Sequence, residues 1–166
     1  MAEAWDKSRE KAKELRIENW GSLDEVIIMA EPIRQASSRH TAMNYLREIS
    51  EHSPFISRSG LTARLSRRSL GKIVSHAAVI NSITPEAHYL AAANIDKIFS
   101  NAIEPWEFEL NPNKENAGLK ARRYLYAPMQ YDGEIFIVKF TVKEFENIDL
   151  ENKIYAIEAV FVDLSI

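Results

Sequence analysis

The 166-residue sequence contains no cysteine. This absence excludes disulfide bonds and thiolate zinc sites, and it agrees with a reducing, cytoplasmic location. No apolar run approaches the length of about 18 residues that a membrane helix needs, and residues 1–15 contain no apolar signal-peptide region. The sequence therefore predicts a protein without a membrane span or an export signal.

Several catalytic motifs are also absent. The sequence has no glycine-rich phosphate loop, no G-x-S-x-G motif and no paired-carboxylate motif, so hydrolase, kinase and dinucleotide chemistries lack support. Four histidines stand at positions 40, 52, 76 and 88, and none has a metal-binding spacing such as His-x-x-x-His. We therefore expect neither a metal site nor a cofactor.

Charge is unevenly distributed along the chain. The formal net charge of −3 argues against a protein that coats nucleic acid generally, while 46% hydrophobic and 27% charged residues are typical of a globular chain. Residues 52–85 contain no acid at all. A local basic patch is expected there, although a solvated helix surface would give the same pattern. Its cations are Arg58, Arg64, Arg67, Arg68 and Lys72.

Helices are predicted in the first two thirds of the chain. Thr84 and Pro85 are typical of a helix start, and apolar residues at spacings of three and four continue from there towards residue 104. Further helices are predicted over residues 32–52 and 66–78, with a loop from 53 to 60. His52-Ser53-Pro54 is the expected domain boundary, which divides the chain into a helical N-terminal extension (1–55) and an α+β domain (56–166).

Three strands are predicted after the helices, over residues 121–130, 134–144 and 153–163. Asp132-Gly133 lies between the first two, and this dipeptide is a strong signal for a type I′ hairpin turn. Short connections usually join neighbouring strands, so residues 134–144 should lie between the other two. The expected fold class is α+β, with N-terminal helices followed by a small antiparallel sheet of three to four strands.

The predicted turn aligns polar side chains on one face of the hairpin. Residues whose numbers sum to 265 should pair, and alternation along a strand turns every second side chain to the same face. Directly opposed cations destabilise a sheet, so we expect an anion or a carboxylate between Arg122 and Lys143. The alternative is a solvated strand face, with a salt bridge from Glu158. The predicted pairs are Arg122 with Lys143, Tyr124 with Thr141, and Tyr126 with Lys139.

The two tyrosines and His88 each allow two interpretations. Tyr124 and Tyr126 could stack on bases or pack against neighbours. His88 lies one turn into the helix that starts at Thr84, at the border of its apolar stripe. It could be a partly buried histidine with satisfied hydrogen bonds, or a general acid or base, because imidazole titrates near neutral pH.

Several short blocks follow one another in order between Leu65 and Asp163. They are Leu65-Ser66, Lys72–Ser75, Ser82, Pro85–His88, Ala92–Asp96, Phe99, Ala102, Thr141–Glu144 and Tyr155–Glu158. Together they resemble a domain of large polyvalent proteins of phages and mobile elements, of the barnase–EndoU–colicin–RelE-like nuclease type. The resemblance implies helices before a curved antiparallel sheet and metal-independent RNA cleavage. The implied catalytic residues are His88, Lys139 and Thr141, with Arg122 and Lys143 beside them.

These observations predict two alternative functions. The first is a nuclease-like binding module that holds RNA or another anionic partner through the cationic sheet face, with Arg122, Lys143, Tyr124 and Tyr126 as anion-binding residues. The second is an active ribonuclease or toxin domain. Catalysis requires His88 to lie within one water molecule of Lys139 in an accessible site. A buried His88, or one on the far side of the sheet, favours the module. The oligomeric state is not predicted.

Overall fold

A long β-hairpin forms the centre of the computed structural model, which describes residues 33–104, 109–110, 119–146 and 153–164. Its strands are β4 (Leu119–Tyr131) and β5 (Glu134–Glu146). In the turn between them, Asp132 has φ 50° and Gly133 has φ 76°. Both values are positive, as a type I′ turn requires. From Ala121 onwards the register is the predicted one, with Arg122 opposite Lys143.

Two further strands complete an antiparallel sheet in the order β3-β4-β5-β6. β3 (Glu109–Leu110) pairs with β4, and β6 (Lys153–Leu164) pairs with β5. The predicted central position of the second long strand and the predicted α+β class are therefore confirmed. A separate two-stranded ladder pairs β1 (Phe55–Ile56), which lies in the segment expected to be a loop, with β2 (Thr62–Ala63), which follows that segment.

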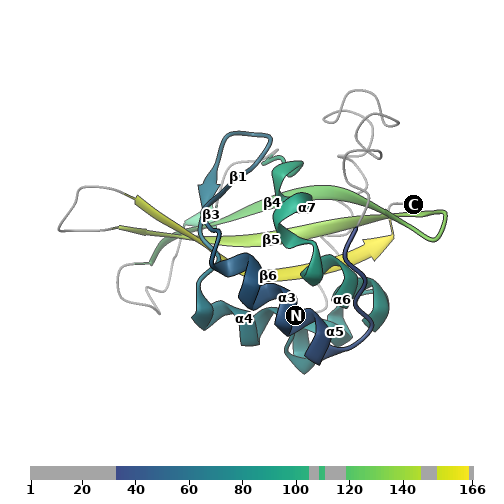
Figure 1. Cartoon of the computed structure of the whole chain (residues 1–166). Helices are drawn as coiled ribbons and strands as arrows, with labels where there is room; N and C mark the ends of the chain where they lie inside the picture. Colours follow the sequence, from purple (N-terminus) through teal and green to yellow (C-terminus); the bar gives the residue numbers. More distant parts are fainter. Residues whose placement is uncertain (1–32, 105–108, 111–118, 147–152, 165–166) are drawn as a thin grey trace.

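Helices gather on one face of the long sheet (Figure 1), with α4, α5 and α6 in contact with β6. The sheet residues that face them are mainly apolar and alternate with the outward residues. Those core residues are Leu125, Ala127, Met129, Phe136, Val138, Phe140, Val142, Ile157 and Val162. The helices are α3 (Arg39–Ser50), α4 (Arg67–Ile73), α5 (His76–Asn81), α6 (Pro85–Ala93) and α7 (Ile95–Ser100).

Residues 33–50, which the sequence assigned to an N-terminal extension, contribute to this same core. Ala42, Leu46 and Ile49 of α3 are buried in one cluster with the sheet residues. The helix predicted from residue 32 begins instead at Arg39, where the Ser38 side chain accepts a hydrogen bond from the backbone of Thr41. The rest of the extension before residue 33 lies outside the described residues.

Two helices predicted as continuous are each divided, which corrects the sequence-based boundaries. The segment 66–78 breaks at Ser75, whose side chain accepts a hydrogen bond from Ala78 and caps α5. The long helix from Pro85 breaks at Asn94. The Asn94 amide accepts hydrogen bonds from the backbone N–H groups of Ile33 and Arg34, and it donates to the carbonyl of Arg34. This contact joins segments 60 residues apart, so local spacing does not reveal it.

An ion pair reinforces the same junction. Arg34 donates two hydrogen bonds to Asp96 at the start of α7, at 2.6 Å and 3.2 Å. The hydrogen bond to Asp96 raises the pKa of the Arg34 guanidinium above its ordinary value. Two-point arginine–carboxylate pairs fix geometry as well as charge. Arg34 and Asn94 together therefore hold the chain before α3 against the α6–α7 corner.

We predict opposite stability effects for alanine at two glycines. Neither Gly133 nor Gly71 has an atom within 4 Å of the position of an added Cβ, so sterics with neighbours play no part. Gly133 has positive φ, and Gly133→Ala should lower the free energy of unfolding by about 1–2 kcal/mol. Gly71 lies within α4, and Gly71→Ala should raise it by about 0.5–1 kcal/mol. Urea unfolding measures both; equal effects would contradict the assigned turn geometry.

Candidate functional site

The outer sheet face is the surface of the β4–β5 hairpin that points away from the helices. The core residues of both strands alternate with it, so its members share one side of the sheet. It unites six of the seven residues that the sequence predicted for the site. They are Arg122, Tyr124, Tyr126, Lys139, Thr141 and Lys143.

The tyrosines of this face differ in their environment. Tyr126 is only 1% exposed and packs with Ile137 and Ile103, and its burial raises its pKa to about 12. Its phenol therefore stays protonated at neutral pH. Tyr124 is partly exposed, and the Lys139 ammonium lies 4.5 Å from the centre of its ring. Such a cation–π contact holds the lysine charge over the aromatic face.

Two cations lie side by side at one end of the outer sheet face. Arg122 and Lys143 are directly paired across β4 and β5, and both side chains are partly exposed. On its other side Arg122 pairs in register with Glu109 of β3, while Lys143 pairs with Ala156 of β6. Glu109 is therefore the register neighbour of Arg122 in the sheet. Two adjacent cations favour an anion at this position.

His88 lies elsewhere, in the core between the helices and β6. It is fully buried, with Nδ1 2.7 Å from the Ser82 hydroxyl and Nε2 2.6 Å from the Ile73 carbonyl oxygen. The Ser82 oxygen also accepts a hydrogen bond from the backbone N–H of Val162 in β6. These contacts connect α4, α6 and the edge of the sheet through one side chain.

The hydrogen-bond partners assign the protonation state of His88. A carbonyl oxygen can only accept, so Nε2 must carry the proton that it donates to Ile73. The Ser82 hydroxyl then donates to the unprotonated Nδ1. Burial lowers the pKa of His88, and the hydrogen bond to Ile73 opposes this effect to a smaller degree. The imidazole is therefore neutral at physiological pH, with every ring nitrogen satisfied.

The structure does not bring His88 together with Lys139 and Thr141. His88 lies on the helical side of the sheet, whereas those two side chains belong to the outer sheet face. The sequence placed His88 at the border of the apolar stripe of its helix. Its partners come from Ile73 and Ser82, in other segments, so the full burial of His88 is a tertiary effect.

A partly buried ion pair on the helical side was not predicted. Arg123 donates to both carboxylate oxygens of Glu104, with a distance of 2.6 Å from Nε to Oε2, and its Nη1 lies 3.8 Å from Glu144. The Glu144 side chain is 2% exposed. The alternation of side chains along the strands could have revealed this ion pair, because Arg123 and Glu144 occupy core-facing positions of two neighbouring strands. A charge in a core stripe indicates a charged partner.

Within the residues that the structure describes, no group of three or more His, Asp or Glu side chains is placed to hold a metal ion. No helix in the same part of the chain is both long and apolar enough to cross a membrane.

Helices packed on one face of a four-stranded antiparallel sheet, with cations and tyrosines on the other, define an α+β domain with a polar outer sheet face. The family model of large polyvalent protein-associated domain 3 matches residues 33–155, from the segment before α3 into β6. The chain belongs to this phage-related family, as the resemblance indicated. No curated protein and no solved structure matches the chain.

We predict that His88 makes stability depend on pH. The folded state lowers the pKa of His88, so the unfolded state binds its proton first as pH falls. The free energy of unfolding should be at its plateau above about pH 6.5 and should decrease by up to about 1.4 kcal/mol per pH unit below it. His88→Gln should unfold more easily at pH 7.5 and lose this decrease, as measured by urea unfolding from pH 5.5 to 7.5.

His76→Gln is the matched control, because His76 is exposed on α5. It should keep the pH dependence of the wild type. If His88→Gln and the wild type lose stability in parallel as pH falls, His88 is not the buried neutral group described here.

Proposed function

We propose that this domain binds single-stranded nucleic acid through the outer sheet face. The observation that carries the proposal is the direct pairing of Arg122 with Lys143 on the outer sheet face, where both side chains are partly exposed. Phosphate oxygens are anions that arginine and lysine recognise, and arginine can contact them through two N–H groups. A phosphate beside this pair would meet two cationic side chains at once.

Neighbouring side chains suit the same ligand. Tyr124 lies in the row next to that of Arg122 and forms a cation–aromatic contact with Lys139 of the following row, and Thr141 adds a hydroxyl donor opposite Tyr124. Proteins that bind single strands combine cations for the backbone with aromatic rings for the bases. Tyr124 is the ring offered to a base in this proposal, because it is partly exposed, while the buried Tyr126 supports it from within.

The alternative is a metal-independent ribonuclease in which His88, Lys139 and Thr141 act together. General acid–base catalysis needs a titrating group within hydrogen-bond reach of the reacting atoms. His88 is buried, carries hydrogen bonds on both ring nitrogens and lies behind the sheet, which favours binding over catalysis by this residue. We therefore propose a binding module that leaves bound RNA intact.

The Arg122→Gln/Lys143→Gln double variant tests the binding site. Its affinity for a labelled single-stranded RNA should fall about tenfold at low salt, because two phosphate contacts are lost. The slope of log K against log salt should become shallower by about 1.4, at about 0.7 per phosphate for single strands. Fluorescence anisotropy over a salt series measures both quantities.

Arg58→Gln/Lys97→Gln is the control, since it removes the same charge from exposed residues outside this face. It should change the affinity little. Equal losses of RNA affinity in the two double variants would show that net charge alone causes the loss. That result would contradict a site at Arg122 and Lys143. Cleavage of RNA by the pure protein, resistant to a chelator and absent from Lys139→Gln, would support the ribonuclease instead.

A further inference from the structure

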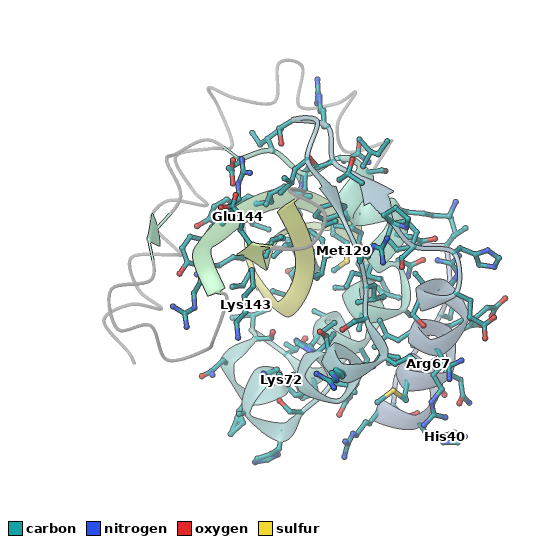
Figure 2. All side chains as sticks on the ribbon, turned by 90° about the vertical axis from the view of Figure 1, so that its left-hand side faces the viewer. His40, Arg67, Lys72, Met129, Lys143 and Glu144 are labelled. Atoms are coloured by element: carbon teal, nitrogen blue, oxygen red, sulfur yellow. The ribbon has the colours of Figure 1, made fainter. Side chains whose placement is uncertain are left out.

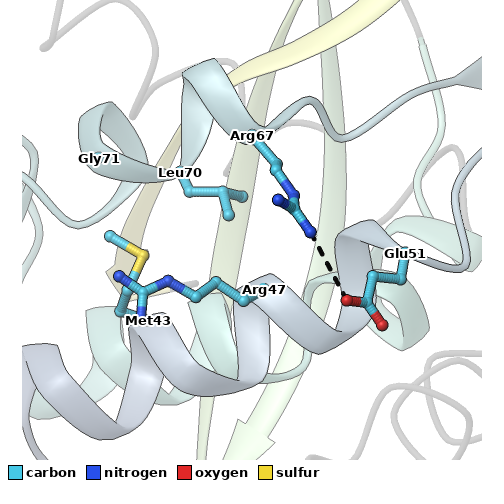
Figure 3. Close-up of a pocket in the computed structure, with 6 residues that line it drawn as sticks. All are labelled: Met43, Arg47, Glu51, Arg67, Leu70 and Gly71. Carbon is cyan, nitrogen blue, oxygen red and sulfur yellow. Dashed lines mark ion pairs between the residues drawn. The ribbon is translucent and has the colours of Figure 1, made fainter.

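A groove separates α3 from α4 on the helical side of the molecule (Figure 3). It has a volume of about 310 Å³ and is lined by Met43, Arg47, Glu51, Arg67, Leu70 and Gly71. Met43 and Leu70 form an apolar floor, and at Gly71 the wall has no side chain, with open space where a Cβ would project. An apolar side chain of moderate size can therefore enter between the two helices.

The groove continues along α3 as a second hollow of about 380 Å³, which shares Met43 and Arg47 and adds Arg39 and His40. Arg39, Met43 and Arg47 follow at intervals of four residues, so they lie along one side of the helix over about 12 Å. This length matches about four residues of an extended peptide or two turns of a helix. The combined feature is called the α3–α4 groove below.

The charges on this groove favour an acidic ligand. Arg39, Arg47 and Arg67 contribute three cations to its walls and Glu51 one carboxylate. Glu51 lies 3.7 Å from Arg67, and both side chains are largely exposed, at 62% and 81%. Exposed ion pairs of this kind contribute little stability. A carboxylate of a ligand can therefore replace Glu51 at Arg67 at small cost.

We propose that the α3–α4 groove binds an acidic peptide segment of a partner protein, with an apolar side chain on Met43 and Leu70 and carboxylates on Arg47 and Arg67. Arginine pairs with carboxylates through two parallel hydrogen bonds. The apolar floor adds a buried contact with an apolar side chain of the peptide. A nucleic acid fits less well, because the floor of the groove is apolar and no Phe, Tyr or Trp lines it to stack on a base.

This site is separate from the outer sheet face. Figure 2 shows Arg67 and His40 on the helices, well apart from Lys143 at the end of the sheet. The peptide site therefore goes beyond the proposed nucleic-acid function, and the two can be tested independently.

The probe is a labelled twelve-residue peptide with two leucines four residues apart, flanked by glutamates, and the readout is fluorescence anisotropy with the full chain. Arg47→Gln/Arg67→Gln should weaken binding at least tenfold. Gly71→Leu, which fills the groove without a change of charge, should do the same. Glu51→Gln should strengthen binding two- to threefold, because it removes the competing carboxylate. Arg122→Gln/Lys143→Gln should leave peptide affinity unchanged and serves as the charge-matched control.

Four results would overturn the peptide site. The first is equal affinity in the wild type, Gly71→Leu and Arg47→Gln/Arg67→Gln. The second is equal binding of a glutamate-only peptide, which would make the contact a general charge effect. The third is loss of RNA binding instead of peptide binding in the Arg47→Gln/Arg67→Gln variant, which would assign the groove to nucleic acid. The fourth is a concentration-dependent dimer that Gly71→Leu abolishes, which would make the occupant a second copy of this chain.

Discussion

The register of the β4–β5 hairpin is the constraint on which the rest of the molecule depends. Positive φ at Asp132 and Gly133 sets the turn, and the turn sets which residues pair along both strands. A slip by one residue would turn the apolar stripe of β5 to the outside and the cations to the core. One short dipeptide thus decides both where the helices pack and where the outer sheet face lies.

The two sides of the sheet therefore serve different purposes. The helical side is a closed core in which the polar groups His88, Asn94 and Arg123 are each tied to named partners. Such satisfied buried groups fix the packing of separate segments. The outer side combines the buried Tyr126–Ile137 cluster with the partly exposed side chains of Arg122, Tyr124, Lys139, Thr141 and Lys143. Binding to a partner is therefore expected at the outer sheet face and at the exposed α3–α4 groove.

Sequence reasoning succeeded where the determinants were local. The hairpin register, the strand order and the Thr84–Pro85 helix start all follow from neighbouring residues, and the structure confirms them. It failed where a distant segment intervened. Asn94 breaks a helix because it bonds the backbone near residue 34, and His88 is buried because Ile73 and Ser82 reach it from other segments. Six of the seven predicted site residues share a face because register alone places them there.

Lysine footprinting with and without RNA tests the central claim most directly. The protein is acetylated at limiting reagent in the presence of a single-stranded RNA, and each lysine is quantified by mass spectrometry. A site on the outer sheet face predicts protection of Lys139 and Lys143, while the exposed Lys97 of α7 reacts as it does in the free protein. Protection of Lys97 with unchanged reactivity at Lys139 and Lys143 would contradict it.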